Sequence, residues 1–277
     1  MTLTQILIVI ALGIIEGITE WLPISSTGHM LLFDKVLTIN ASPEFKSMFF
    51  VVIQLGAILA VVILYWHKLW PIAKKENKLT LKKDTLALWL KTIIAIIPSG
   101  IVGILLDDWM DEHLHTPLVI ALALIIYGAL FIIIEKRNKN RTAITKSTDD
   151  ITYSLALYVG LFQILSLIPG TSRSGATIMG ALLLGLDRTT AAEFSFYMGI
   201  PTMAGASLIK ILKFGFSYTS AELIILTLGT LTAFVVSLAV IKFLMSYIKR
   251  RDFTAFGIYR IILGVIIIMS LIFGVIS

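Results

Sequence analysis

Six apolar stretches, each about as long as a membrane is thick, constrain the fold of this chain more than any other feature. They cover residues 47–66, 85–106, 117–134, 192–213, 222–245 and 256–276. Because an α-helix needs about 20 residues to cross a hydrocarbon core of about 30 Å, they predict six transmembrane helices. Only 14% of the residues are charged, against about 25% in soluble domains. We therefore expect an all-α polytopic membrane protein.

The remaining composition excludes several classes of function. The chain has no cysteine, so disulfides and thiol chemistry are absent. Its formal net charge of +6 comes from Lys and Arg in short loops, which does not indicate nucleic-acid binding. No nucleic-acid partner is expected, whereas contact with lipid is, and a homodimer is left open.

Two further apolar regions are interrupted at their centres by proline, glycine and hydroxyl residues. In the first, residues 3–15 and 30–37 flank the interruption, and in the second residues 153–168 and 176–186 do. Each half is too short to span a membrane. The pattern favours two re-entrant helical hairpins over two full spans with a kink, because irregular backbone at membrane depth must be enclosed by protein.

The two interrupted regions also resemble each other. Three residues of the first recur 147 positions later as the same or a similar residue: Gly13, Glu16 and Gly28 match Gly160, Gln163 and Gly175. The single membrane domain, 1–277, then divides into repeats of about 1–134 and 151–277, joined by 135–150. Each repeat holds one hairpin and three spans, and because three is odd the repeats must be inverted. Inverted repeats place binding sites near the midplane, where broken helices meet.

Loop charges predict the orientation of the chain. The loops at 67–84, 135–150 and 246–255 are basic, whereas the loop at 107–116 holds four acidic residues and no Lys or Arg. Because positive loops stay in the cytoplasm, the three basic loops are expected to be cytoplasmic. The acidic loop and both termini are then outside.

The first interruption begins with two carboxylates at helical spacing. Glu16 and Glu20 are four residues apart, so on a helix both face the same way. Close carboxylates repel, and a general base or a site for a hard divalent metal can result. The simpler alternative is a pair at a helix end that faces lipid headgroups.

A polar turn follows these carboxylates and restarts a helix. After Pro23 it contains the hydroxyl and imidazole side chains of Ser25, Ser26, Thr27 and His29. Hydroxyl residues cap helices, and free amides at a helix start attract anions. Capping accounts for one hydroxyl but not for three. A serine nucleophile at Ser26 would need an adjacent base, which Glu20 or His29 could supply.

The second interruption places an arginine in an equally apolar setting. Its polar members are Gly170, Ser172, Arg173, Ser174 and Thr177. Arginine binds phosphate oxygens with two parallel hydrogen bonds, and hydroxyls and amides can complete a cradle. An internal ion pair from Arg173 to Glu16 or Glu20 is the simpler alternative. The Walker pattern of nucleotide-binding loops is absent.

Three further polar residues in the spans are weaker candidates for the functional site: Gln54, Lys91 and Arg260. Each could merely pair with another group or extend its polar end to the membrane surface.

With these two motifs, the whole chain resembles the bacterial undecaprenyl-diphosphate phosphatase family of the bacitracin-resistance type. The resemblance implies hydrolysis of the lipid diphosphate to the monophosphate and phosphate, at the cytoplasmic membrane of a bacterium. It also implies a divalent cation, Mg²⁺ or Ca²⁺, for which Glu16 and Glu20 are the predicted ligands. The predicted catalytic residues are Glu16, Glu20, Ser26, His29 and Arg173. Ser25, Thr27, Gly170, Ser172, Ser174 and Thr177 would bind the substrate.

Two other classes remain to be compared. Type-2 phosphatidic-acid phosphatases carry a histidine six residues after their motif arginine, but this chain has Met179 there. Inverted repeats with broken helices are also typical of secondary transporters, so a lipid flippase or carrier is the alternative function. The hydroxyls beside the carboxylates favour the hydrolase.

Overall fold

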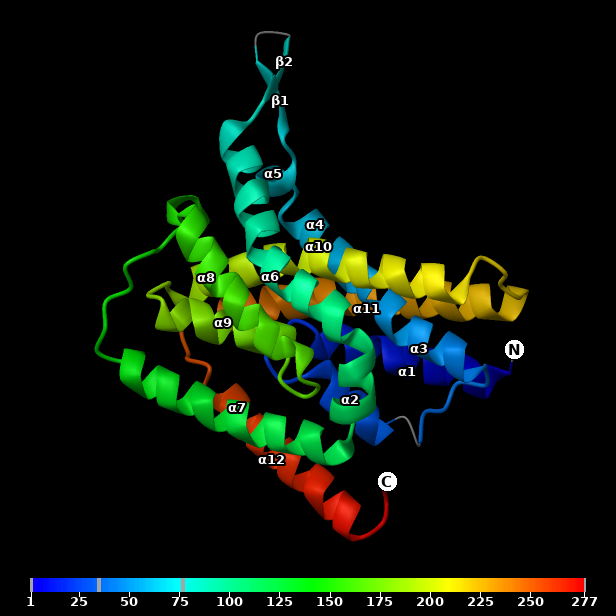
Figure 1. The fold of residues 1–277 in the computed structure, drawn as a ribbon. Coiled ribbons are helices and arrows are strands. Elements are labelled where there is room, and N and C mark those ends of the chain that lie inside the picture. The colour runs from blue at the N-terminus through cyan, green and yellow to red at the C-terminus, as the bar shows by residue number, and fades with distance from the viewer. Residues whose placement is uncertain (1, 34–35, 76–77, 277) are drawn as a thin grey trace.

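The computed structural model describes residues 2–33, 36–75 and 78–276, which form a helical bundle with one small β-ribbon (Figure 1). Within these residues, five segments are long and apolar enough to cross a membrane. They are α3 (Pro43–Val52) with α4 (Gln54–Leu64), the first part of α6 (Lys83–Leu114), α7 (Pro117–Asn138), α11 (Ser220–Ile248) and α12 (Thr254–Ile272). The predicted all-α polytopic membrane protein is confirmed.

The sixth expected span, 192–213, lies in α10 (Arg188–Phe214), which is 27 residues long but is not among those five segments. Most residues from 190 to 199 are buried, because α10 packs against α3, α4, α6 and α9. A helix enclosed by protein can carry polar side chains that lipid would not tolerate. Helix α10 is therefore an internal helix of the bundle, and protein encloses most of its first half.

Both interrupted regions form a helix, a turn and a second helix. The first consists of α1 (Leu3–Thr19) and α2 (Ser26–Phe33). The second consists of α8 (Tyr153–Gln163), the 3₁₀ helix η2 (Ile164–Leu167) and α9 (Arg173–Leu183). The predicted interruptions are confirmed, while re-entry into the membrane stays a prediction.

Three expected loops contain regular structure. The acidic segment 107–116 was expected to be a loop, but α6 continues through it to Leu114. The basic segment 67–84 includes the last residues of α5 (Trp66–Leu69) and an antiparallel ribbon of β1 (Ile72–Lys75) and β2 (Lys78–Leu81). In the loop at 135–150, Thr145 forms a parallel bridge with Leu186, next to a 3₁₀ turn, η1 (Thr148–Asp150).

Each hairpin packs on a long helix of the other half of the sequence. Helix α1 lies along α11, and α8 lies along α6. Glycines make both contacts close: a Cβ on Gly13 would lie 2.9 Å from the Gly229 carbonyl oxygen, and one on Gly160 would overlap the Ala95 carbonyl. Each hairpin is thus held by the other half of the sequence, while the inverted repeats stay a prediction.

The tight contact at Gly160 predicts a selective loss of stability. In Gly160→Ala the new methyl group would meet backbone of α6, so the two helices must separate, at a cost of about 1–3 kcal/mol. Gly205→Ala in α10 is the matched control, because a Cβ there meets no atom within 4 Å and alanine favours a helix. Thermal unfolding in detergent should show a lower midpoint for Gly160→Ala alone. Equal midpoints would contradict the contact.

Candidate functional site

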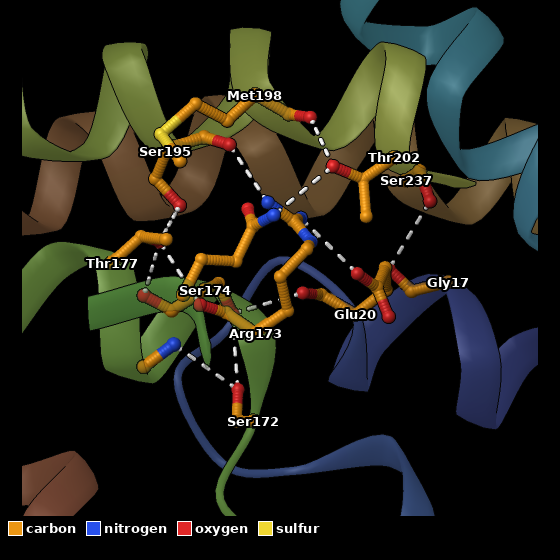
Figure 2. A network of polar contacts seen from close by, with 12 residues as sticks. Gly17, Glu20, Ser172, Arg173, Ser174, Thr177, Ser195, Met198, Thr202 and Ser237 are labelled. Atoms are coloured by element: carbon orange, nitrogen blue, oxygen red, sulfur yellow. Dashed lines mark hydrogen bonds and ion pairs between the residues drawn. The ribbon is translucent and has the colours of Figure 1, made fainter. Parts of the chain in front are cut away.

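The two hairpin turns meet at an ion pair (Figure 2). Glu20 Oε1 of the first turn lies 3.1 Å from Arg173 Nη2 at the start of α9. Only 8% of the Glu20 side chain and 10% of the Arg173 side chain are exposed. The structure thus brings together the two motifs that are 153 residues apart in the sequence.

Glu16 lies one helical turn before Glu20, as the spacing predicted. The Glu20 amide donates to the Glu16 carbonyl at 3.0 Å, and Glu16 is 1% exposed. Its Oε1 atom is buried and has no hydrogen-bond partner among residues 2–33, 36–75 and 78–276. Because a buried carboxylate without a partner is costly, Glu16 needs a proton, a water molecule or a cation.

Arg173 is held by α10 as well as by Glu20. Its Nη1 donates to the Ser195 carbonyl at 2.7 Å, and its guanidinium carbon lies 5.7 Å from the centre of the Trp21 ring. A Cβ on Gly199 would lie 2.8 Å from Nη2, so glycine is required for the guanidinium to fit. Sequence analysis did not select Ser195 or Gly199, because nothing in a long helix marks the residues that face a distant arginine.

The hydroxyl groups of the second motif fasten α9 to its neighbours. Ser174 Oγ donates to the Glu20 carbonyl at 3.1 Å, and Thr177 Oγ1 lies 2.7 Å from Ser195 Oγ. Ser172 caps α9 by accepting from the Gly175 amide at 3.2 Å. Ser174 and Thr177 are fully buried, whereas Ser172 is partly exposed. Of the three, Ser172 is the one placed to meet a ligand.

The first motif presents two hydroxyls that the protein does not use. Ser26 and Thr27 begin α2, are partly exposed, and make no side-chain hydrogen bond within the described residues. Ser25 before them is buried, and its Oγ accepts from the Gly28 amide at 3.4 Å. A free hydroxyl at a helix start is suited to contact an anion or to react with one.

The two turns share an uncommon backbone conformation. Among the described residues, Ser25 and Ser172 are the non-glycine residues with positive φ, and both have φ of 72°. Such conformations are strained for serine and cluster at functional sites. Each serine precedes a short helix and accepts from the glycine three residues later, Gly28 or Gly175. The geometry therefore pairs Ser25 with Ser172, which are separated by the same 147 positions as the matched residues of the two interrupted regions.

His29 faces α12 instead of the hydroxyl of Ser26. Its Nδ1 lies 2.7 Å from the Ser25 carbonyl oxygen, and its Nε2 lies 2.7 Å from the Tyr259 hydroxyl. Because a carbonyl only accepts, Nδ1 carries the proton, and in the neutral ring Nε2 accepts from Tyr259. As a base for Ser26, His29 would have to exchange this partner. Tyr259, which also stacks on the imidazole, was not predicted.

Arg260, one residue further along α12, joins the two turns. Its Nη1 donates to the Pro23 carbonyl at 3.2 Å and its Nη2 to the Gly170 carbonyl at 2.9 Å. The side chain is fully buried, so it does not snorkel to an interface. Gly175 leaves room for it, since a Cβ there would lie 3.1 Å from Nη1. Of the two alternatives that the sequence left open for Arg260, pairing and snorkelling, the structure shows the first.

Gln163 occupies in the second hairpin the position that Glu16 has in the first. Its Nε2 donates to Ser99 Oγ at 2.6 Å and to Thr202 Oγ1 at 3.3 Å. Thr202 in turn donates to the Met198 carbonyl of α10 (Figure 2). The amide therefore joins α8 to α6 and α10 without adding a third carboxylate to Glu16 and Glu20.

Buried polar atoms without partners gather in this region. In the described part of the chain they are Glu16 Oε1, Trp21 Nε1, Gln163 Oε1, Thr171 Oγ1, Arg173 Nε and Arg260 Nε. All belong to the hairpins or to the arginine that bridges them. Each costs about 1–3 kcal/mol if left unpaired, and such groups indicate bound water, an ion or a ligand. The cluster contains both donors and acceptors, as a site for an anion with its cation requires.

The carboxylates of Glu16 and Glu20 fit Mg²⁺ better than Ca²⁺. No group of three or more His, Cys, Asp or Glu side chains forms a metal site among residues 2–33, 36–75 and 78–276. Glu16 and Glu20 offer two carboxylates, one with a free buried oxygen. Mg²⁺ is commonly bound by one or two carboxylates together with water and substrate phosphates, whereas Ca²⁺ takes about six to eight oxygens. The donor set fits Mg²⁺.

Comparison with known proteins gives a consistent result. Residues 9–266 match the family described as bacitracin resistance protein BacA. An undecaprenyl-diphosphatase from Enterococcus faecalis is 62% identical over 266 residues, which cover 96% of each chain. One from Lachnoclostridium phytofermentans is 58% identical, covering 96% of this chain and 97% of its own. One from Acetivibrio thermocellus is 55% identical, covering 94% and 95%.

The two hydrogen bonds of Arg260 predict that lysine cannot replace it. A lysine could reach one of the two carbonyls but not hold both, because it lacks the planar fork. Losing one charged hydrogen bond should lower stability by about 1.5–3 kcal/mol. Arg251→Lys, in an exposed loop, is the control. If thermal unfolding in detergent gave both variants the same midpoint, Arg260 would not be the link between the turns.

Proposed function

Because this chain belongs to the bacitracin resistance protein BacA family, we infer that it is an undecaprenyl-diphosphate phosphatase. It is a multi-pass membrane enzyme that hydrolyses the lipid diphosphate to the lipid monophosphate and inorganic phosphate. This reaction recycles the lipid carrier of cell-wall synthesis. The observation that supports it most directly is the buried pair of Glu20 and Arg173, which joins two polar turns inside an apolar bundle.

The site supports binding of a diphosphate whose lipid tail stays in the bilayer. Arg173 keeps Nε free, so it can bond to phosphate oxygens while Glu20 and Ser195 hold the rest of its guanidinium. The partly exposed hydroxyls of Ser172, Ser26 and Thr27 and the first amides of α2 and α9 can complete the cradle. Gly170 and Ser25 shape the two turns behind them. Ser174 and Thr177 keep α9 in place.

We assign a Mg²⁺ ion to Glu16 and Glu20 when substrate is present. When bound, the ion neutralises phosphate charge and polarises the phosphoryl group. The free Oε1 atom of Glu16 supports this assignment, because it is a buried acceptor with no partner among the described residues. Glu20 contributes less to the ion, since one of its oxygens already accepts from Arg173.

Ser26 is the proposed nucleophile. Its Oγ attacks the terminal phosphorus, its proton passes to a base, and the bond from phosphorus to the bridging oxygen breaks. The lipid monophosphate leaves with that oxygen, and water then hydrolyses the phosphoserine to free phosphate. The base is Glu20, which already accepts from Arg173, or His29, which would first have to release Tyr259. Direct attack by water, with the same base, is the competing route.

The orientation and assembly of the chain are also proposals. The basic loops support a cytoplasmic position for 67–84, 135–150 and 246–255, with the acidic segment and both termini outside. The first hairpin then enters from the outer face, where spent lipid diphosphate is released. Light scattering of the purified protein tests the proposed homodimer.

Phosphate release from a polyprenyl diphosphate in detergent tests the function, and Arg173→Lys tests the site. Lysine keeps the charge but loses the fork, so we expect turnover to fall about 100-fold. Arg251→Lys should retain wild-type turnover. Near wild-type turnover by Arg173→Lys would remove Arg173 from the centre of the site. Folded wild-type protein with no release under any divalent metal would favour the flippase or carrier instead.

A substitution at Gly199 should displace the Arg173 guanidinium without changing Arg173 itself. In Gly199→Ala the added methyl would lie 2.8 Å from Arg173 Nη2, which pushes the guanidinium away from Glu20. A displacement of about 1 Å can cost about 100-fold in rate. Gly205→Ala, six residues further along α10, adds the same methyl in open space. Kinetics of phosphate release should show the loss for Gly199→Ala only, and equal rates would refute the role of this contact.

A further inference from the structure

The β-ribbon before α6 has one apolar face. In its register Ile72 pairs with Leu81, and Lys74 pairs with Leu79. Because paired residues in an antiparallel ribbon point to the same side and neighbours alternate, these four side chains share one face. Ala73 and Thr80 point to the other. The face therefore combines three large apolar side chains with one lysine.

That apolar face is open to its surroundings. Leu79 is 78% exposed, Leu81 64% and Ile72 37%. A single two-stranded ribbon is only marginally stable in water, and large exposed apolar side chains indicate an interaction surface. The ribbon therefore needs a cover that the described residues do not provide.

Aromatic and cationic residues surround the face. Trp66 and Trp70 at its base are stacked, with ring centres 4.4 Å apart, and are 43% and 42% exposed. Exposed lysines lie on the ribbon and beyond its end: Lys74, Lys78 and Lys83. Tryptophan prefers the boundary between lipid and water, and lysine is attracted to anionic headgroups. This combination matches an anionic lipid surface better than it matches a protein, whose apolar contacts are depleted in lysine.

The direction of the ribbon agrees with this partner. In Figure 1 it extends from the side of the bundle, crosswise to α10 and α11. The ribbon therefore projects away from the helices instead of packing on them, and its apolar face stays open.

We propose that the two strands of the ribbon, β1 and β2, form a surface anchor for a leaflet rich in anionic phospholipid. Ile72, Leu79 and Leu81 enter the boundary between headgroups and acyl chains, and the lysines bind lipid phosphates. By the positive-inside rule this is the cytoplasmic leaflet. The anchor also fixes the start of α6, the helix against which the hairpin that carries Arg173 packs.

The absence of cysteine allows a site-specific test in the whole protein. Leu79→Cys and Thr80→Cys place one fluorophore on either face of the ribbon, in nanodiscs of phosphatidylcholine with or without phosphatidylglycerol. A nitroxide lipid quencher should quench the Leu79 probe and spare the Thr80 probe, and phosphatidylglycerol should strengthen the difference. Leu81→Cys repeats the test on the same face if Leu79→Cys does not fold.

Removing positive charge should weaken the anchor in a graded way. Lys74→Gln, which changes the lysine paired with Leu79 on the same face, should shift the Leu79 probe toward water about fivefold, the equivalent of about 1 kcal/mol per lysine. Arg251→Gln, in another basic loop, should leave the probe unchanged. Equal quenching of the two faces, or a Leu79 probe shielded from lipid and water quenchers alike, would overturn the proposal. The second result would show that protein covers the face.

Discussion

The ion pair between Glu20 and Arg173 is the interaction on which the rest of the structure depends. Neither charge is tolerable alone in an apolar bundle, and removing one partner of such a pair typically costs about 3–5 kcal/mol. The pair therefore forces the two hairpin turns together, although 153 residues separate them. Arg260 completes the junction by donating to a carbonyl of each turn.

Around this junction, some helices pack closely through glycines and another provides the polar contacts of Arg173. Glycines let α1 approach α11 and α8 approach α6, while α10 supplies the Ser195 carbonyl and the space at Gly199 for Arg173. The pairing leaves Glu16 Oε1 and Arg173 Nε buried and without partners among the described residues. An anion accompanied by a divalent cation would satisfy both at once. The two buried atoms that lack partners are therefore the atoms to which we assign the metal ion and the phosphate.

The sequence predicted the parts of this site that are chemically unusual for a membrane. Glu16, Glu20 and Arg173 stood out because lipid excludes charge, and both interruptions were visible from proline and glycine. Ser195, Gly199 and Tyr259 could not be found that way, because their importance lies in what they face across helices distant in sequence. The apolar run at 192–213 predicted a sixth span, but it could not show that protein encloses this part of α10.

A double-mutant cycle of Glu20→Gln and Arg173→Met, measured as phosphate release from a polyprenyl diphosphate, tests the central claim most directly. If the pair and the bound diphosphate act as one unit, the double variant should be no slower than the slower single variant. Losses that multiply fully would contradict the account, because they would show that the two side chains act at independent places.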